Sequence, residues 1–185
     1  MGFVERYVRS LSAANLQDDA FHRQAEPLLA AAFATAGISG DIGPLLHRVK
    51  YADDLTRDTA NLAQLLRLWT AEVIKRGRHR KWVSENTAWD AQAAQKLYRT
   101  VAELSLAHWL DGTCRVCAGS GQADSVVCRA CEGRGEAPIG HAGGFVRERV
   151  KDMVSELHGI ASSHATRANA RLNDPAPDDY REKNK

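Results

Sequence analysis

The apolar residues of this chain recur mainly at intervals of three and four, which is the spacing of one face of an α-helix. Outside the segment that holds the cysteines, alternating β-branched runs are scarce, whereas the helix-favouring residues Ala, Leu, Arg and Gln are common. The pattern therefore predicts a mainly α-helical protein. We expect helices at residues 3–16, 27–36, 45–50, 54–75, 84–110 and 144–172.

Apolar stripes run along the three longest predicted helices, so these helices are expected to pack together as a bundle. The stripes comprise Leu55, Leu62, Leu65, Leu66, Trp69 and Val73 in the first, Trp89, Ala93, Leu97, Val101, Leu104 and His108 in the second, and Val146, Val150, Met153, Leu157 and Ile160 in the third. Asp53 and Asp54 are expected to cap the first of these helices and Ser84 the second, because short polar side chains accept hydrogen bonds from the first N–H groups. Asp111 and Gly112 should end the second.

Glycines and prolines divide the chain into three predicted segments. Gly37, Gly40 and Gly43 indicate a flexible joint between an N-terminal helical arm, residues 1–40, and a helical core, residues 44–172. Residues 173–185 combine two prolines with polar side chains and have almost no apolar area to bury. This last segment is therefore expected to be a disordered tail.

All four cysteines lie within residues 114–131, in the pattern Cys-x-x-Cys-x-Gly-x-Gly repeated at an offset of fourteen residues. Two cysteines separated by two residues can bind one ion if the backbone turns tightly, and glycine permits such turns. We therefore predict one structural Zn²⁺ in a hairpin at residues 111–136, bound by Cys114, Cys117, Cys128 and Cys131. Four thiolates leave no open position for a catalytic water. The alternatives are two disulfides, four free thiols or an iron–sulfur cluster.

Composition favours a folded, soluble protein, since 44% of the 185 residues are hydrophobic and 26% are charged. No apolar run approaches the roughly 20 residues of a membrane helix, and the first ten residues are too charged for a secretory signal. We therefore expect no membrane association and a cytoplasmic location, where reducing conditions favour metal binding over disulfides. The net charge of +2 predicts no partner by itself.

Basic residues are concentrated in two segments, 75–81 and 147–151. The first is predicted to be an exposed connection between two helices, and the second opens the last helix, where Arg147 and Lys151 share one face. Concentrated positive charge binds DNA, nascent RNA or an acidic protein surface. Trp82, beside the first segment, is a candidate for base stacking or partner contact. The alternative for the first segment is that basic residues near a helix C-terminus complement the helix dipole, and the alternative for the second is a solvated helix face. The candidate DNA- or polyanion-binding residues are Lys75, Arg76, Arg78, Arg80, Lys81, Arg147, Arg149 and Lys151.

The cysteine repeat, with a long helix directly before it and a helical segment after it, resembles the zinc-containing Q antitermination proteins of lambdoid phages. The matched residues are the four cysteines and Gly119, Gly121, Gly133 and Gly135. This resemblance implies that the hairpin interrupts a helix-turn-helix-like DNA-binding unit. It also implies that the protein binds double-stranded DNA at a late promoter, loads onto bacterial RNA polymerase while the sigma factor is present, and suppresses termination. The loop between Cys117 and Cys128 is shorter than in the lambda-type protein.

The same repeat resembles the cysteine-rich region of DnaJ-type co-chaperones, which implies a zinc-binding protein-interaction module. That region carries four copies of the repeat and follows a J domain with His-Pro-Asp, whereas this chain has two copies and no His-Pro-Asp. A DNA-processing enzyme would need a further divalent-metal site, and the sequence shows no nucleophile, base and orienting residue in a catalytic pattern. We therefore expect no enzymatic activity.

Overall fold

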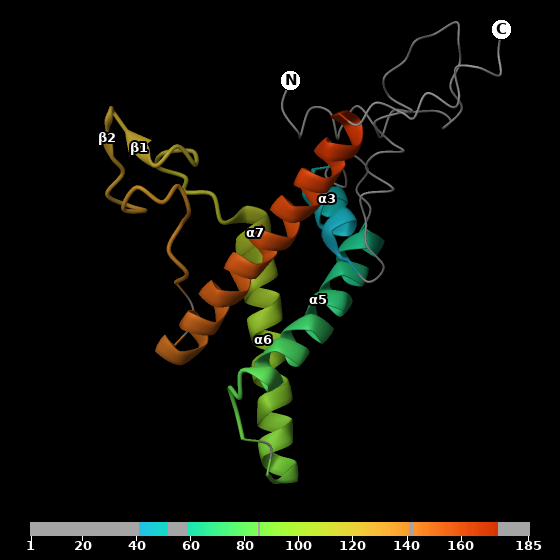
Figure 1. The fold of residues 1–185 in the computed structure, drawn as a ribbon. Coiled ribbons are helices and arrows are strands. Elements are labelled where there is room, and N and C mark those ends of the chain that lie inside the picture. The colour runs from blue at the N-terminus through green and yellow to red at the C-terminus, as the bar shows by residue number, and fades with distance from the viewer. Residues whose placement is uncertain (1–40, 52–58, 85, 141–142, 174–185) are drawn as a thin grey trace, which may run out of the picture. The chain divides into compact units, whose positions relative to one another are not determined.

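The structure is a computed structural model that describes residues 41–51, 59–84, 86–140 and 143–173. Its elements in chain order are α3 (Gly43–Tyr51), α5 (Thr59–His79), α6 (Ala88–Asp111), β1 (Gln122–Ala123), β2 (Val126–Val127) and α7 (Gly144–Asn173) (Figure 1). The prediction of a mainly helical protein is confirmed. The predicted helices at 3–16 and 27–36, the proposed caps Asp53 and Asp54, and residues 174–185 lie outside the described residues.

The chain divides into two compact units. One unit is Ala63–His158, and the other consists of Met1–Leu62 with Gly159–Lys185. The helices α5 and α7 each contribute residues to both. Among the described residues, no helix combines the length and hydrophobicity that crossing a membrane requires.

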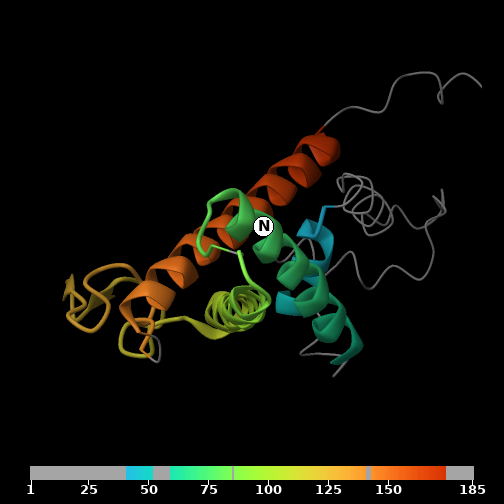
Figure 2. The same cartoon turned by 90° about the horizontal axis from the view of Figure 1, so that it is seen from below.

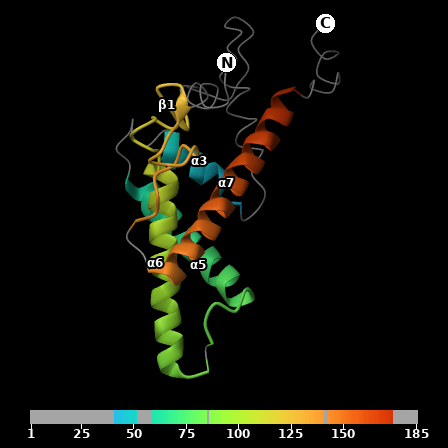
Figure 3. The ribbon, with the colours of Figure 1, turned by 90° about the vertical axis from the view of Figure 1, so that its left-hand side faces the viewer.

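Within the first unit, α5 and α6 pack around Trp69 and Tyr98, both of which are fully buried or nearly so. The Trp69 indole N–H donates a hydrogen bond to Ser105 Oγ at 2.9 Å, so its one polar group is satisfied inside the core. A Cβ atom on Gly77 would lie 2.4 Å from the Tyr98 ring. Glycine at this helical position therefore permits the close approach of the ring. Figure 3 shows α5 and α6 joined by the short connection that follows α5.

The predicted stripe is confirmed in part on α5, where Leu65, Trp69 and Val73 are buried. It is also confirmed at the centre of the α7 stripe, where Val150, Met153 and Leu157 are buried. Of the stripe predicted for α6 only Val101 is buried, so the predicted register is wrong. The buried residues of α6 are Ala94, Tyr98, Val101, Ala102, Ser105, Leu106 and Trp109.

The error on α6 has a physical cause. Three of the seven buried positions of this helix, Ala94, Ala102 and Ser105, carry small or polar side chains, which a search for large apolar residues passes over. Trp89, placed in the predicted stripe, is 75% exposed. Figure 2 looks nearly along α6. Small residues at Ala94 and Ala102 allow neighbouring elements to approach the helix closely.

The start of α6 also differs from the prediction. The N-cap is Thr87, whose Oγ1 accepts a hydrogen bond from the Asp90 N–H at 3.1 Å and donates one to the Asp90 carboxylate at 2.8 Å. Ser84, the predicted cap, lies before the helix. A capping side chain with an acidic residue three positions later is the stronger signal, because each satisfies the other. The predicted end at Asp111, with Gly112 as the C-cap, is confirmed.

In the second unit, α3 packs on the last part of α7 through Gly43 and two histidines. A Cβ atom on Gly43 would lie 2.7 Å from His164 Cβ, so Gly43 is a close-packed helix residue rather than part of the predicted flexible joint. The His47 ring donates to the Ala161 carbonyl oxygen at 3.0 Å, and the rings of His47 and His164 lie 5.1 Å apart. Burial lowers the pKa of His164 to about 4, so this side chain is neutral in the folded protein.

Candidate metal centre

Residues 112–137, which we call the cysteine unit, leave the helical packing at the end of α6 and return before α7 begins. The ends of this segment are bonded to each other. The Ala137 N–H donates to the Gly112 carbonyl oxygen at 2.8 Å, and Thr113 pairs with Glu136 in an antiparallel bridge. Beyond them, β1 and β2 form a two-stranded antiparallel sheet (Figure 1). The cysteines therefore lie in a segment whose two ends are hydrogen-bonded to each other.

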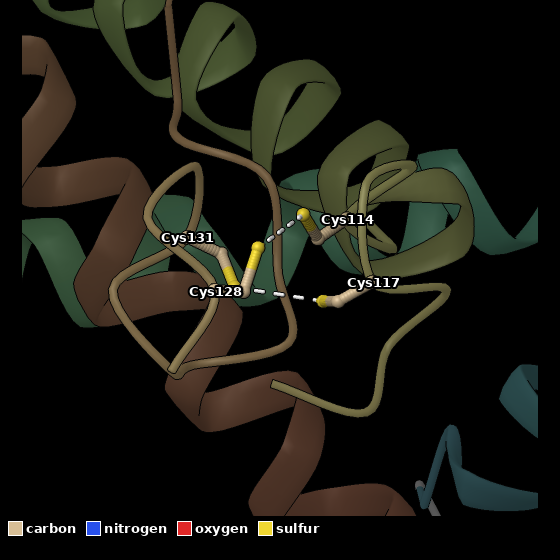
Figure 4. Close-up of side chains that lie close together, drawn as sticks. All are labelled: Cys114, Cys117, Cys128 and Cys131. Atoms are coloured by element: carbon tan, nitrogen blue, oxygen red, sulfur yellow. Dashed lines mark hydrogen bonds between the residues drawn. The ribbon is translucent and has the colours of Figure 1, made fainter. Parts of the chain in front are cut away.

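The four sulfur atoms converge from two separate turns (Figure 4). The Sγ atoms of Cys114 and Cys128 are 4.0 Å apart, those of Cys117 and Cys131 are 3.7 Å apart, and all four lie within 4.8 Å of one another. A tetrahedral zinc ion with Zn–S bonds of about 2.3 Å requires sulfurs about 3.8 Å apart, whereas a disulfide requires about 2.05 Å. All four cysteines are buried, free thiols. The cluster thus has the size of a site for a single ion.

The spacing also bears on the iron–sulfur alternative. A cluster of several metal atoms holds its thiolates farther apart than one ion does. The four sulfurs surround a space that fits one ion, and each cysteine contributes one ligand atom. The arrangement can therefore hold a metal ion with a complete four-sulfur shell, which is the arrangement of a structural rather than a catalytic site.

The fourteen-residue repeat of the sequence is also a repeat of hydrogen bonds. The Cys114 N–H donates to the Gly135 carbonyl oxygen at 2.9 Å, and in the other half the Cys128 N–H donates to Gly121 at 2.9 Å. The pair Thr113 and Glu136 has its counterpart, fourteen residues apart in each position, in the pair Val127 and Gln122. Each half therefore closes the turn of the other, and neither half is complete alone.

At two of the glycine positions, Gly121 and Gly135, no residue with a side chain fits. Gly121 has a φ of +74°, and a Cβ atom there would lie 2.4 Å from the Gly133 carbonyl oxygen. Gly135 has a φ of +75°, and its Cβ would lie 2.4 Å from the Gly119 carbonyl oxygen. Both the backbone angle and the close approach exclude a side chain. The glycines that accompany the cysteines in the sequence are thus explained by the geometry of the turns.

The pKa values of two of the four thiols, Cys117 and Cys131, are shifted in opposite directions. Burial raises the pKa of the Cys131 thiol, and the neighbouring thiols bring it to about 11, although the Gly135 N–H donates to this sulfur at 3.3 Å. Burial also acts to raise the pKa of Cys117, but the N–H groups of Gly121 and Gly119 and two neighbouring thiols lower it to about 7. A bound divalent cation would favour the thiolate form of all four cysteines.

Glu136 fastens the cysteine unit to the two helices that flank it. One carboxylate oxygen lies 3.6 Å from His108 Nε2 on α6, and the other lies 2.9 Å from His158 Nε2 on α7. The rings of His158 and Trp109 also lie close to perpendicular, with centroids 6.4 Å apart. Sequence reasoning did not identify this contact, because no spacing rule connects residues so far apart in the chain.

The two predicted basic segments are brought together by the structure. The helix α5 continues to His79, so residues 75–79 are helical and the prediction of an exposed connection is wrong for them. Arg76 and Arg80 each lie 2.5 Å from a carboxylate oxygen of Glu156 on α7, and Arg80 also approaches Asp152. The salt bridges place the end of α5 beside the first half of α7. The first basic segment and the start of α7, which carries the second, thus lie side by side.

Trp82 does not have the exposure that base stacking requires. It is 6% exposed and packs against Tyr98, with ring centroids 6.0 Å apart. The Arg149 guanidinium lies 5.4 Å from the Trp82 ring and 4.8 Å from the Phe145 ring. Trp82 is therefore a core residue, and Arg149 connects the segment after α5 to the start of α7 through its contacts with the two rings.

Among the other predicted cations, the side chains most open to solvent come from both segments. Lys75 is only loosely paired with Glu72, at 3.8 Å, and its side chain is 79% exposed. Lys151 pairs with Glu148 at 2.9 Å. The exposed members of the predicted set are Lys75, Arg78, Arg80, Lys81, Arg147 and Lys151.

Comparisons of the chain with protein-family models, with curated proteins and with solved structures gave no match.

Proposed function

We propose that this chain is a zinc-stabilised transcription antitermination factor, similar in action to the lambdoid phage Q proteins. It binds double-stranded DNA at a late promoter, loads onto bacterial RNA polymerase while sigma factor is present, and stays attached to suppress termination. The observation that carries the proposal is the four-cysteine cluster between α6 and α7, within the unit that also gathers the two basic segments. No catalytic step is part of the proposal.

Zinc is the metal that the donor set favours. Thiolates are soft ligands, and a cavity sized for one ion with four sulfurs suits Zn²⁺ better than Mg²⁺ or Ca²⁺, which prefer oxygen. Cys114, Cys117, Cys128 and Cys131 would hold the ion. Its contribution would be the folding free energy of the cysteine unit, which otherwise buries little apolar surface.

The proposed DNA-binding region, which we call the basic surface, consists of the eight cations Lys75, Arg76, Arg78, Arg80, Lys81, Arg147, Arg149 and Lys151. Four acidic residues are paired with members of this set: Glu72, Glu148, Asp152 and Glu156. The excess of four positive charges is sufficient to attract the DNA backbone and to release counterions from it. Nascent RNA is a second polyanion that this surface could hold during elongation.

The order of elements also supports the proposal. In the family that the chain resembles, a zinc hairpin interrupts a helix-turn-helix-like unit, and here the cysteine unit separates α6 from α7. Arg147 and Lys151 are exposed on the first two turns of α7. In a helix-turn-helix protein, residues near the start of the second helix contact base edges in the major groove. We therefore assign α7 as the proposed recognition helix.

Transcription across a terminator tests the proposal. The template carries the protein's own late promoter upstream of a terminator, and the readout is the fraction of transcripts that extend past the terminator. The wild-type protein should raise this fraction. The double variant Lys81→Glu, Arg147→Glu should lose this effect and bind promoter DNA at least tenfold more weakly, whereas Lys96→Glu, an exposed charge reversal on α6 outside the basic surface, should behave as wild type. Unchanged termination with the wild-type protein would refute the proposal.

A second candidate function rests on a different observation. Three valines on the cysteine unit are strongly exposed: Val116 at 66%, Val126 at 62% and Val127 at 60%. Exposed apolar side chains favour the zinc-binding protein-interaction module that DnaJ-type regions represent. Salt discriminates the two functions. DNA binding should fall by about a thousandfold between 50 and 200 mM salt if six phosphates are contacted, whereas binding to an unfolded protein should change little.

A further inference from the structure

A groove of about 410 Å³ runs between α5 and α6 within the unit Ala63–His158. Its lining residues include Ala63, Leu66, Arg67 and Ile74 from α5, and Arg99 and Glu103 from α6. None of these residues belongs to the basic surface or to the cysteine unit. The groove is therefore a feature that the proposed DNA-binding function does not use.

The floor of the groove is apolar and faces away from the core. Leu65, Trp69 and Val73 form the buried stripe of α5, whereas Leu66 and Ile74, each one residue further along, are rotated by about 100° and only half-buried. From Ala63 to Ile74 the helix rises by roughly 16 Å, or three turns. Thr70 also lines the groove between Leu66 and Ile74, and its hydroxyl donates to the Leu66 carbonyl oxygen at 2.7 Å, so the polar atom is already bonded. A strip of this length matches three turns of a second helix.

The rim of the groove carries more positive than negative charge. The Arg67 side chain is exposed and has no ion pair with any residue in the described part of the chain. Across the groove, Arg99 pairs with Glu103 at 2.9 Å, and the Arg99 side chain remains 74% exposed. Two arginines thus flank an apolar floor, with one carboxylate to balance them. A complementary ligand carries apolar residues at its centre and carboxylates at its edge.

We propose that this groove binds an amphipathic α-helix of a protein partner, with apolar side chains seated on Leu66 and Ile74 and an acidic side chain paired with Arg67. Helix-in-groove binding uses apolar anchors three and four residues apart, and the strip along α5 has the length for two or three such anchors. Nucleic acid is a poorer match, because its phosphates would meet Glu103 and an apolar floor. Since the groove and the basic surface share no residue, DNA and a protein partner could be bound at the same time.

Two synthetic fourteen-residue peptides test the proposal with the full-length protein. Both are helical and carry leucines at positions 3, 7, 10 and 14, but one has glutamates beside this stripe and the other has lysines. Fluorescence anisotropy of a label on each peptide measures binding. We expect the glutamate peptide to bind at least tenfold more tightly than the lysine peptide. Equal binding of the two peptides, or no binding of the glutamate peptide, would overturn the proposal.

Three variants locate the binding. Ile74→Glu and Arg67→Glu should each weaken binding of the glutamate peptide by about tenfold or more. Leu68→Glu places the same charge at a 40% exposed position of α5 that does not line the groove, and it should bind the peptide as wild type does. Arg67→Glu lies at an exposed position, so it remains informative if Ile74→Glu disturbs folding, which thermal unfolding followed by circular dichroism would reveal.

Two further outcomes would contradict the proposal, and each points to a different site or occupant. If the peptide binds only after residues 1–40 have been removed, the occupant of the groove is a segment of this chain rather than a partner. If Arg67→Glu leaves peptide binding unchanged, the peptide binds elsewhere. Promoter DNA binding should be the same in wild type and Arg67→Glu, so a failure of this inference is distinguishable from a failure of the proposed DNA-binding function.

Discussion

The cysteine unit and the α5–α6 packing lie in the same compact unit but are stabilised by different physics. In the cysteine unit the buried side chains are the four cysteines, with only Ala123 packed partly against them, and the turns are closed by backbone hydrogen bonds. Between α5 and α6, large side chains are buried: Trp69, whose indole N–H is bonded to Ser105, and Tyr98, which packs against Trp82. We therefore expect the first region to depend on a bound cation, whereas the second depends on apolar area removed from water. The two should fail under different perturbations.

Removing the metal should produce the largest effect, and it should be confined to the cysteine unit. A chelator, or the substitution Cys128→Ser, should abolish binding of the single zinc ion and remove on the order of 10 kcal/mol of local folding free energy. Metal analysis of the purified protein should fall from one zinc per chain to none. Amide hydrogen exchange should rise sharply in residues 112–137.

The helices provide the control within the same experiment. Exchange of the amides around Trp69 and Tyr98 should stay slow after metal removal, because their packing contains no metal ligand. Global unfolding of α5 and α6 on chelation would contradict the separation of the two regions.

A change of pH should weaken a different set of contacts, the packing of α3 on α7. Burial lowers the pKa of His164 from 6.5 to about 4, so the unfolded chain takes up the proton at a higher pH than the folded chain does. The stability from this neutral histidine is therefore complete above pH 6.5 and is lost as the pH falls toward 4, by about 3 kcal/mol in all. Denaturant unfolding between pH 7 and 4 measures this slope, and His164→Leu should flatten it. An unchanged slope in the variant would assign the pH dependence to other groups.

A methyl group added at Gly77 should damage the helical packing without affecting the metal. The new Cβ of Gly77→Ala would lie 2.4 Å from the Tyr98 ring and 2.8 Å from Trp82, so both rings must move. We expect a loss of about 2 kcal/mol in the free energy of unfolding, with zinc affinity unchanged.

Gly159→Ala is the matched control for this substitution, because a Cβ at that helical position meets no atom within 4 Å. It should stabilise the protein by about 0.5–1 kcal/mol, since alanine favours helix over glycine. Thermal unfolding of the two variants should therefore shift in opposite directions.

The smallest predicted loss of stability concerns the cap of α6. Thr87→Ala removes the side chain that accepts from the Asp90 N–H and should cost about 1 kcal/mol. Ser84→Ala should change the free energy of unfolding by less than about 0.5 kcal/mol, because Ser84 is exposed before the helix. If the order of the two effects were reversed, the helix would begin at the residue that the sequence pattern first indicated.

The contrast between the cysteine unit and the helical packing also explains which features could be predicted from the sequence. The cysteine cluster was predictable because its ligands are close in sequence and their spacing reflects the local turn. The centre of α7 was predictable because Val150, Met153 and Leu157 are large and regularly spaced. The buried face of α6 was not, since its buried positions include alanines and a serine, whose hydropathy gives little signal.

Contacts between segments that are distant in the chain could not be predicted from the sequence, for a different reason. Glu156 attracts Arg76 and Arg80 across roughly eighty residues of chain, and Arg149 reaches Trp82 in the same way. A basic run reads as exposed when its acidic partners are elsewhere in the sequence. Only the three-dimensional arrangement reveals that part of its charge is already paired.

The bond between the Ala137 N–H and the Gly112 carbonyl oxygen brings the two ends of the cysteine unit to one point. A segment whose entrance and exit coincide can be lengthened, exchanged or excised without altering the path of the chain before or after it. Apart from the contacts of Glu136 with His108 and His158, the host helices therefore place few demands on what is inserted at this junction. Evolution, or an engineer, could graft a different recognition loop there while α6 and α7 keep their own packing.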